Sequence, residues 1–181
     1  MTSEEYLRAV TLGEVKPHDA PVLLVPYDPG WPSLYEALAA RIRGALGAGV
    51  ITLEHVGSTS VPGLCAKPVI DVLLVVPDSK DEGTYVPMLE AQGFALHIRE
   101  PGWFEHRLLK GRDIAANVHV FSAGCEEPAR MLAFRDRLRS HEGDRQAYES
   151  KKRELAARTW RHVQHYADAK SEVVREILGR S

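Results

Sequence analysis

The chain has 181 residues, a formal net charge of −2 at pH 7 and two cysteines, Cys65 and Cys125. This length suits one domain, and the charge argues against a protein devoted to nucleic-acid backbones, which would be markedly basic. No apolar segment approaches ~20 residues and no signal-peptide pattern opens the chain, so we expect no membrane contact. Two widely spaced cysteines suggest reduced thiols, and we therefore expect a cytoplasmic protein.

The first 20 residues are polar and mixed, and we expect them to form an N-terminal arm with at most a short helix between Ser3 and Val10. Residues 21–181 are then a single domain. Val22–Val25 has the composition of a short strand. Trp31 opens a helix in which apolar residues recur every four positions, as in a helix packed on a core.

Residues 54–77 read EHVGSTSVPGLCAKPVIDVLLVVP and contain the most informative pattern of the chain. Two β-branched, apolar runs, Val50–Val56 and Val69–Val76, predict two strands joined by a loop. The glycine and proline residues of this loop leave room for at most one helical turn.

Gly57 and Ser58 end the first of these strands, and a glycine there lets a ligand approach the backbone N–H groups closely. Asp71 is the single acid in the second strand, where burial is costly without a partner or a metal. Lys67 precedes that strand. It could be a solvated loop lysine, or it could pair with an anion held by the Gly57–Ser58 turn.

Three more strands are predicted at residues 94–98, 103–109 and 113–121, and their short loops indicate a meander. In the last strand, Asn117, His119 and Phe121 share one face. His119 could be a half-buried histidine satisfied by a backbone carbonyl, or a functional residue. On the preceding strand, His106 and Arg107 point to opposite faces.

From Glu127 onward the pattern is helical. Arg135 and Arg139 lie one turn apart, as do Tyr148 and Lys152 on the next predicted helix. A charged, solvated helix face would explain the arginines without any ligand. A final helix is expected between Tyr166 and Leu178.

The segment HVGSTSVPGLCAKPVIDV resembles the signature of the GrpB-like family, a branch of the nucleotidyltransferase superfamily. The similarity extends to VPYDPGWPSLYE, NVHVF and AFRDRLRSHEGDRQAYESKKRELA, and so covers residues 22–178. The resemblance implies an α/β (α+β) fold with a nucleotidyltransferase-like mixed, mostly antiparallel sheet, flanking helices and a helical C-terminal segment that closes over the Gly57–Ser58 turn.

The resemblance also implies roles for individual residues. Asp71 would hold Mg²⁺, and His119 would act as general base or replace a missing ligand. The residues implied to bind nucleotide phosphates are Gly57, Ser58, Thr59, Lys67, Arg107, Arg135, Arg139, Tyr148, Lys152 and Lys170. The superfamily usually carries a second acid two positions after the first, and here that position is Leu73, which argues against ordinary two-metal chemistry.

The sequence is compatible with two functions. The first is a nucleotidyltransferase that uses a nucleoside triphosphate, ATP by resemblance, to modify a small-molecule acceptor or to activate it as an adenylate. The alternative is a nucleotide-binding or phosphate-binding module without catalysis that assists a partner enzyme. Related domains occur fused to an enzyme of coenzyme A synthesis, so such an enzyme is the partner that the resemblance implies.

Overall fold

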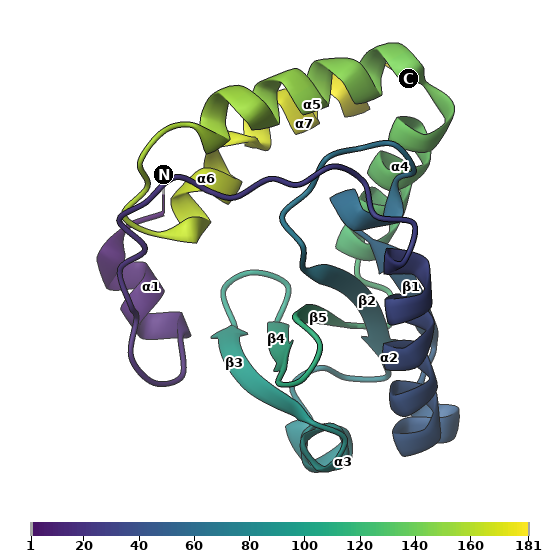
Figure 1. Ribbon diagram of the computed structural model, residues 1–181. Coiled ribbons are helices and arrows are strands. Elements are labelled where there is room, and N and C mark those ends of the chain that lie inside the picture. The colour runs from purple at the N-terminus through teal and green to yellow at the C-terminus, as the bar shows by residue number, and fades with distance from the viewer. Residues whose placement is uncertain (1, 181) are drawn as a thin grey trace.

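The computed structural model describes residues 2–180, which form one five-stranded sheet with helices around it (Figure 1). The strands are β1 (Thr52–Val56), β2 (Ile70–Val76), β3 (Phe94–Glu100), β4 (His106–Gly111) and β5 (Ala116–Ser122). The helices are α1 (Glu4–Val10), α2 (Trp31–Leu46), α3 (Val86–Ala91), α4 (Glu127–Ser140), α5 (Glu142–Ala156), α6 (Val163–Ala169) and α7 (Ser171–Leu178).

The sheet has the strand order β1-β2-β5-β4-β3. Only the β2–β5 pair is parallel, and the other three pairs are antiparallel. Asp71 pairs with Asn117 and Leu73 pairs with His119. Because side chains alternate along each strand, this register brings Asp71, Asn117 and His119 to one face of the sheet.

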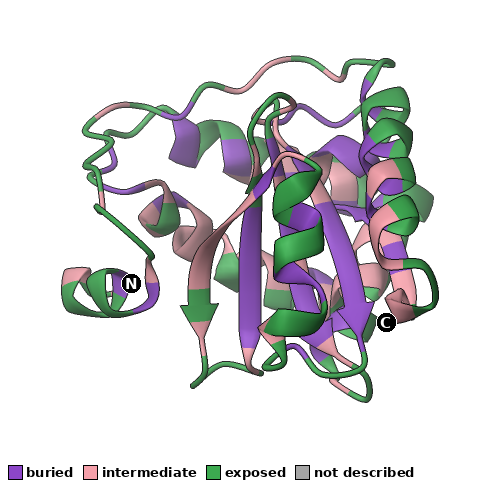
Figure 2. Cartoon of the chain, turned by 90° about the horizontal axis from the view of Figure 1, so that it is seen from below, coloured by how far each residue is buried: buried purple, intermediate pink, exposed green. Residues whose placement is uncertain are grey.

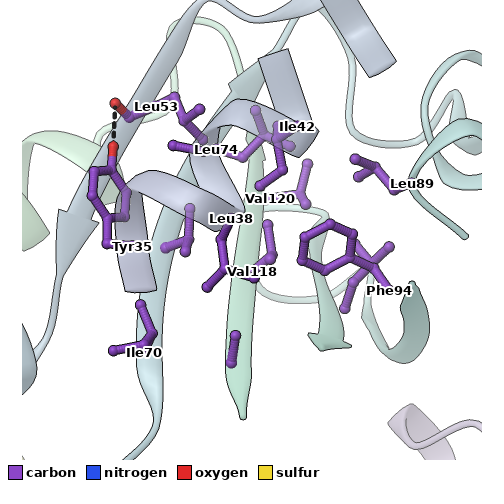
Figure 3. Packing of buried hydrophobic residues seen from close by; sticks show 14 of the residues in the cluster. Tyr35, Leu38, Ile42, Leu53, Ile70, Leu74, Leu89, Phe94, Val118 and Val120 are labelled. Atoms are coloured by element: carbon purple, nitrogen blue, oxygen red, sulfur yellow. Dashed lines mark hydrogen bonds between the residues drawn. The ribbon is translucent and has the colours of Figure 1, made fainter. Parts of the chain in front are cut away.

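The opposite face carries the main core, where α2 and α3 pack on the strands. Leu38 and Ile42 of α2 are fully buried against Val118 and Val120 of β5 (Figure 3). The Tyr35 hydroxyl donates a hydrogen bond to the Leu53 carbonyl oxygen at 3.1 Å, so the helix is also fixed to β1 by a polar contact. Most strand residues are buried, whereas the helices are exposed on their outer faces (Figure 2).

The C-terminal helices pack on the loop between β1 and β2. Val61 and Leu64 of this loop form a buried cluster with Leu138 of α4, Tyr148 of α5 and Ile177 of α7. In Figure 1, α5 and α7 run side by side beyond the ends of the strands. The predicted closure of these helices over the Gly57–Ser58 turn is therefore confirmed.

The N-terminal arm is packed onto the domain. The Ser3 side chain caps α1, and the Leu12 amide donates a hydrogen bond to the His97 carbonyl oxygen of β3 at 2.8 Å. Further along, the His18 amide donates to the Arg161 carbonyl oxygen at 2.7 Å. The arm thus runs from the β3 edge of the sheet, past α6, to the start of α2 (Figure 1).

Three details differ from the sequence-based expectations. Val22–Val25 is not a strand, and only Val25 forms an isolated bridge, with Ala66. The fourth strand begins at His106, because the preceding residues form a turn with positive φ at Phe104 and Glu105. The predicted last helix is two helices, which meet at Lys170.

The predicted α/β (α+β) architecture, a mixed and mostly antiparallel sheet with flanking helices and a helical C-terminal segment, is confirmed. Between residues 2 and 180, none of the helices combines the length and apolar character needed to span a membrane.

Candidate functional site

The site begins at the turn that follows β1. Gly57 has a φ of 69°, and a Cβ atom at this position would lie 2.4 Å from Oδ2 of Asp71. Only glycine combines this backbone conformation with such a close approach. The pairing of Val56 with Asp71 explains the proximity, because the end of β1 lies beside the start of β2.

The hydroxyl residues after Gly57 belong to a short 3₁₀ helix, Ser58–Ser60. Ser58 lies in hydrogen-bond contact with Tyr148 of α5. The Thr59 hydroxyl lies 2.9 Å from Nε2 of His55, a ring that is buried and stacked on Tyr35. Burial lowers the pKa of His55 to about 4, so this ring is neutral at pH 7. Thr59 in the turn therefore contacts an uncharged imidazole.

Asp71 lies at the centre of the polar face. Asn117 Nδ2 donates a hydrogen bond to Asp71 Oδ1 at 3.1 Å, and His119 Nε2 lies 3.5 Å from the same oxygen. Burial opposes the charged carboxylate, but the hydrogen bonds of His119 and Asn117 and the positive charge of Lys67 favour it and hold the pKa of Asp71 below its usual range. Asp71 is therefore ionised at neutral pH.

His119 is supported by a chain of polar side chains that extends away from Asp71. His119 Nδ1 lies 3.1 Å from His106 Nε2, and His106 Nδ1 lies 2.6 Å from Glu100 Oε2. The Tyr6 hydroxyl of the arm donates to Glu100 Oε1 at 2.8 Å. The hydrogen bonds from His106 and Tyr6 outweigh burial and keep the pKa of Glu100 below its usual range.

The hydrogen bonds between Glu100, His106 and His119 determine which ring nitrogens carry protons. Burial lowers the pKa of His106, so its ring is neutral at pH 7 and its proton lies on Nδ1, facing the Glu100 carboxylate. His106 Nε2 is then an acceptor and takes a hydrogen bond from Nδ1–H of His119. Nε2 is then the ring nitrogen of His119 that faces Asp71, 3.5 Å from Oδ1.

A pocket of about 240 Å³ opens beside these residues; we call it the Asp71 pocket. Ser58, Asp71 and His119 all line it, so the predicted convergence of these three side chains is confirmed. The other residues with a predicted role that line it are Thr59, Lys67, Lys152 and Lys170. Asn117, Gln164 and Tyr166 also line the pocket but carry no predicted role.

The three lysines of the Asp71 pocket have no counter-charge of their own. Among residues 2–180, neither Lys67 nor Lys152 nor Lys170 forms an ion pair. Lys152 is 2% exposed and donates a hydrogen bond to the Cys65 carbonyl oxygen at 2.5 Å. Lys170 Nζ lies 4.3 Å from the centre of the Tyr166 ring. The pocket therefore contains more cationic groups than anionic ones.

Burial and mutual repulsion weaken the protonation of these lysines. Burial, followed by the charge of Lys170, lowers the pKa of Lys152 to about 7. Burial also lowers the pKa of Lys170 to about 8 and moves that of Lys67 below its usual range. An anion in the pocket would restore all three pKa values toward their usual range, because opposite charge favours the ammonium form.

Tyr166 lines the Asp71 pocket and also packs in the buried cluster around Leu155 and Trp160. It is 3% exposed, and its buried hydroxyl has no hydrogen-bond partner among the described residues. Buried polar atoms without a partner are uncommon in native proteins. The sequence carries no pattern around Tyr166 that singles out this hydroxyl.

Arg107 does not belong to the Asp71 pocket, so its predicted phosphate-binding role is corrected. Arg107 pairs with Val120, whose side chain lies in the α2 core, and therefore points to the face opposite Asp71. Its guanidinium donates to Glu82 at 2.7 Å and to the Glu105 carbonyl oxygen at 2.9 Å.

Arg135 and Arg139 contact the outer side of the turn rather than the pocket. Arg135 donates to the Glu54 carboxylate at 2.8 Å and to the His55 carbonyl oxygen at 3.0 Å. Arg139 donates to the Ser60 carbonyl oxygen at 2.9 Å. In residues 2–180 the pocket lining does not include either arginine, nor Tyr148, whose hydroxyl supports Ser58.

The donor atoms around Asp71 fit one Mg²⁺ ion that shares its coordination with a substrate, because Mg²⁺ binds through one or two carboxylates together with phosphates and water. They do not fit a second ion. Leu73 is fully buried between Val56 and Phe121 on the same sheet face, and the part of the chain described contains no group of three or more His, Cys, Asp or Glu side chains placed to hold a metal.

Comparison with known proteins identifies relatives along nearly the whole chain. A UPF0157 protein of Halalkalibacterium halodurans is 59% identical over 179 residues, which cover 99% of this chain and 92% of that protein. A dephospho-CoA kinase of Mycolicibacterium paratuberculosis is 27% identical over 188 residues, covering 90% of this chain and 46% of that protein.

A solved structure is similar as well. The crystal structure of the conserved protein GrpB from Enterococcus faecalis has a TM-score of 0.75 and 28% sequence identity, covering 87% of this chain and 98% of that one. The sequence profile of the GrpB protein family matches residues 21–180. The chain therefore belongs to the GrpB protein family.

Proposed function

We propose that the Asp71 pocket binds the phosphates of a nucleoside triphosphate, with ATP as the expected nucleotide, and transfers its nucleotidyl group to a small-molecule acceptor. The observation that carries this proposal is the set of three lysines, without ion-pair partners among residues 2–180, around one carboxylate and beside a glycine turn. Lysine ammonium groups bind phosphate as point charges, and backbone N–H groups in such a turn add hydrogen bonds.

Asp71 is the residue that would hold Mg²⁺. When bound, the ion would neutralise charge on the phosphates and favour departure of pyrophosphate. Lys67, Lys152 and Lys170 contribute charge stabilisation from the other sides of the pocket. Since one carboxylate is available, the lysines take a larger share of the neutralisation than they would beside two acids.

In the proposed reaction an oxygen of the acceptor attacks the α-phosphorus of the nucleotide. The bond from this phosphorus to the oxygen that bridges it to the β-phosphate breaks, and pyrophosphate leaves. If the acceptor is a hydroxyl, its proton moves to Nε2 of His119, which acts as general base. Asp71, 3.5 Å away, stabilises the imidazolium that results. A carboxylate acceptor would give an adenylate without needing this proton transfer.

His106 and Glu100 are positioning residues in this scheme. Their hydrogen bonds orient the His119 ring so that Nδ1 faces His106 and Nε2 faces the pocket. Because they lie on the side of His119 away from the pocket, they would not contact the substrate.

Isothermal titration calorimetry with ATP, with and without Mg²⁺, tests the proposal. We expect Mg²⁺ to strengthen ATP binding to the parent protein, and Asp71→Asn to abolish this strengthening while the melting temperature stays the same. Release of pyrophosphate with a panel of acceptors should fall by at least about 100-fold in Asp71→Asn. A parent protein that binds ATP equally well with and without Mg²⁺ would contradict the role of Asp71.

A binding module without catalysis is the second candidate, and the buried Leu73 favours it because one acid holds two metal ions poorly. The similarity to dephospho-CoA kinases suggests an enzyme of coenzyme A synthesis as the partner. This candidate predicts that Asp71→Asn binds ATP as tightly as the parent protein. It also predicts that neither protein releases pyrophosphate with Mg²⁺ or Mn²⁺ for any acceptor tested.

A further inference from the structure

A second cavity, of about 560 Å³, adjoins the Asp71 pocket; we call it the arm cavity. Arm residues between Thr11 and His18 line one side of it, and β3, β4 and the start of α6 line the others. Residues that line both cavities are Lys67, Leu108, Asn117, Val163 and Gln164. A molecule in the arm cavity would therefore reach the pocket from the side of Asn117, the neighbour of Asp71.

The arm cavity is rich in positive charge. Lys16, Lys67 and Lys110 line it, against the single carboxylate of Glu14. None of these three lysines forms an ion pair with any residue from 2 to 180. Lys110 pairs with Asn117 across the strands, which places it on the sheet face that carries Asp71. Burial and the nearby charge of Lys67 lower the pKa of Lys110, as expected for two cations that share a space without an anion.

His162 adds a buried polar atom to the same lining. The residue is 7% exposed, and its Nε2 has no hydrogen-bond partner among the described residues; the nearest carboxylate oxygen, Glu4 Oε1, lies 3.7 Å away. His97 lines the cavity from β3. An oxyanion in the cavity could accept hydrogen bonds from the lysines and from a histidine ring N–H.

We propose that the arm cavity binds the acceptor substrate, and that this acceptor is a small molecule carrying a carboxylate or a phosphate. The anionic group would lie near Lys110 and Lys16, and the reacting oxygen would point past Asn117 toward His119. The assignment as acceptor rests on the proposed nucleotidyl transfer, whereas the anion site itself rests only on the cavity and its cations.

Two probes test the site by two-dimensional NMR at pH 7: succinate for a carboxylate ligand and inorganic phosphate for a phosphate ligand. We expect at least one probe to shift the ring signals of His97 and His162 and the backbone amides of residues 11–18. Lys110→Gln should weaken this binding about tenfold or more, the effect of losing one charged hydrogen bond. Lys80→Gln, which changes an exposed lysine outside both cavities, should leave it unchanged.

ATP titrations separate this inference from the proposed function. Lys110→Gln should bind ATP like the parent protein, whereas Lys170→Gln should lose ATP affinity and keep the probe-induced shifts at His97 and His162. Probe shifts without any ATP binding would overturn the nucleotidyl transfer and leave the anion site standing. If neither probe shifts these signals, or if Lys110→Gln binds both probes like the parent protein, the arm cavity is not an anion site.

Discussion

The Asp71 pocket and helix α4 both carry basic residues, but within residues 2–180 only those of α4 form ion pairs. Arg135 contacts Glu54 and a backbone carbonyl, and Arg137 of α4 lies 2.6 Å from Asp144 of α5. The lysines on the pocket side form no ion pair with any residue between 2 and 180. An ion pair between a basic residue and a carboxylate holds two secondary-structure elements together. A buried basic residue without an ion pair can instead bind an anionic ligand.

The largest expected effect of this difference is on anion binding. Lys152→Met keeps the length of the side chain and removes its charge, so the affinity for ATP should fall by about 1.5–3 kcal/mol, the usual range for a hydrogen bond to a charged group. Stability should change little, because removal of a buried charge offsets the loss of the hydrogen bond to the Cys65 carbonyl oxygen. Calorimetry and thermal melting measure the two quantities.

Lys151→Met is the matched control for this variant. Lys151 is the next residue on α5, lies at the surface and pairs with Glu154 at 3.0 Å. We expect its loss to leave ATP affinity unchanged. Equal effects of the two substitutions would mean that the unpaired lysine has no special role.

The converse is expected for a paired arginine of α4. Arg137→Met removes one of the two arginines that contact the buried Asp144, so the free energy of unfolding should fall by about 1–2 kcal/mol, with ATP affinity unchanged. Urea unfolding measures the change. Arg158→Met, which breaks a pair between exposed side chains on α5 and the segment after it, should alter stability by less than about 0.5 kcal/mol.

The pH dependence of anion binding sharpens the comparison further. The pKa values of Lys152 and Lys170 are about 7 and about 8, so these groups lose their charge as the pH rises through this range. The charges of Asp71 and Glu149, which favour the ammonium form of Lys152, are already present at pH 7. Sulfate, whose own charge is constant from pH 6 to 9, should therefore bind more weakly at higher pH, by at most about tenfold per pH unit for each linked proton.

Stability should change in the opposite direction over the same range. The unfolded chain keeps an ordinary lysine pKa of 10.5, whereas the folded pKa of Lys152 is about 7. Between these values the unfolded chain binds more protons, so the free energy of unfolding of the ligand-free protein rises with pH. Lys152→Met should weaken the pH dependence of both sulfate affinity and the free energy of unfolding. A parent protein whose sulfate affinity does not change with pH would contradict the lowered pKa values of Lys152 and Lys170.

The smallest effect is expected for Arg139→Ala. Arg139 donates to the Ser60 carbonyl oxygen on the outer side of the turn and does not line the Asp71 pocket within the described chain. We expect ATP affinity to stay unchanged at two salt concentrations and stability to change by about 0.5 kcal/mol or less. A tenfold loss of affinity would show that ligands extend beyond the pocket, toward α4.

The sequence predicts the centre of the site because local rules suffice there. Strand alternation places Asn117 and His119 on one face, and the glycine turn and the lone acid mark the ends of neighbouring strands. The same alternation correctly separates His106 from Arg107. Alternation alone does not determine whether His106 or Arg107 lies on the same sheet face as Asp71. That depends on the register between β4 and β5, where Leu108 pairs with His119.

Long-range contacts account for the other differences. Arg135 and Arg139 have the spacing of a continuous basic helix face, but long-range contacts with β1 and with the turn decide where they lie. Tyr6, Glu100 and His106 come from three separate segments, and no local pattern links them to His119. The packing of the arm over a cavity likewise depends on single contacts, such as that between Leu12 and His97.

The packing of Leu73 makes it difficult to introduce a second acid on β2 beside Asp71. An aspartate at this position would be completely buried beside Val56 and Phe121, under Met131 of α4, with no basic side chain in that cluster to neutralise it. Introducing it would require α4 to be redesigned at the same time. The reaction chemistry open to this protein by single substitutions is thus limited by the helix that covers the strand, and not only by the residues that line the pocket.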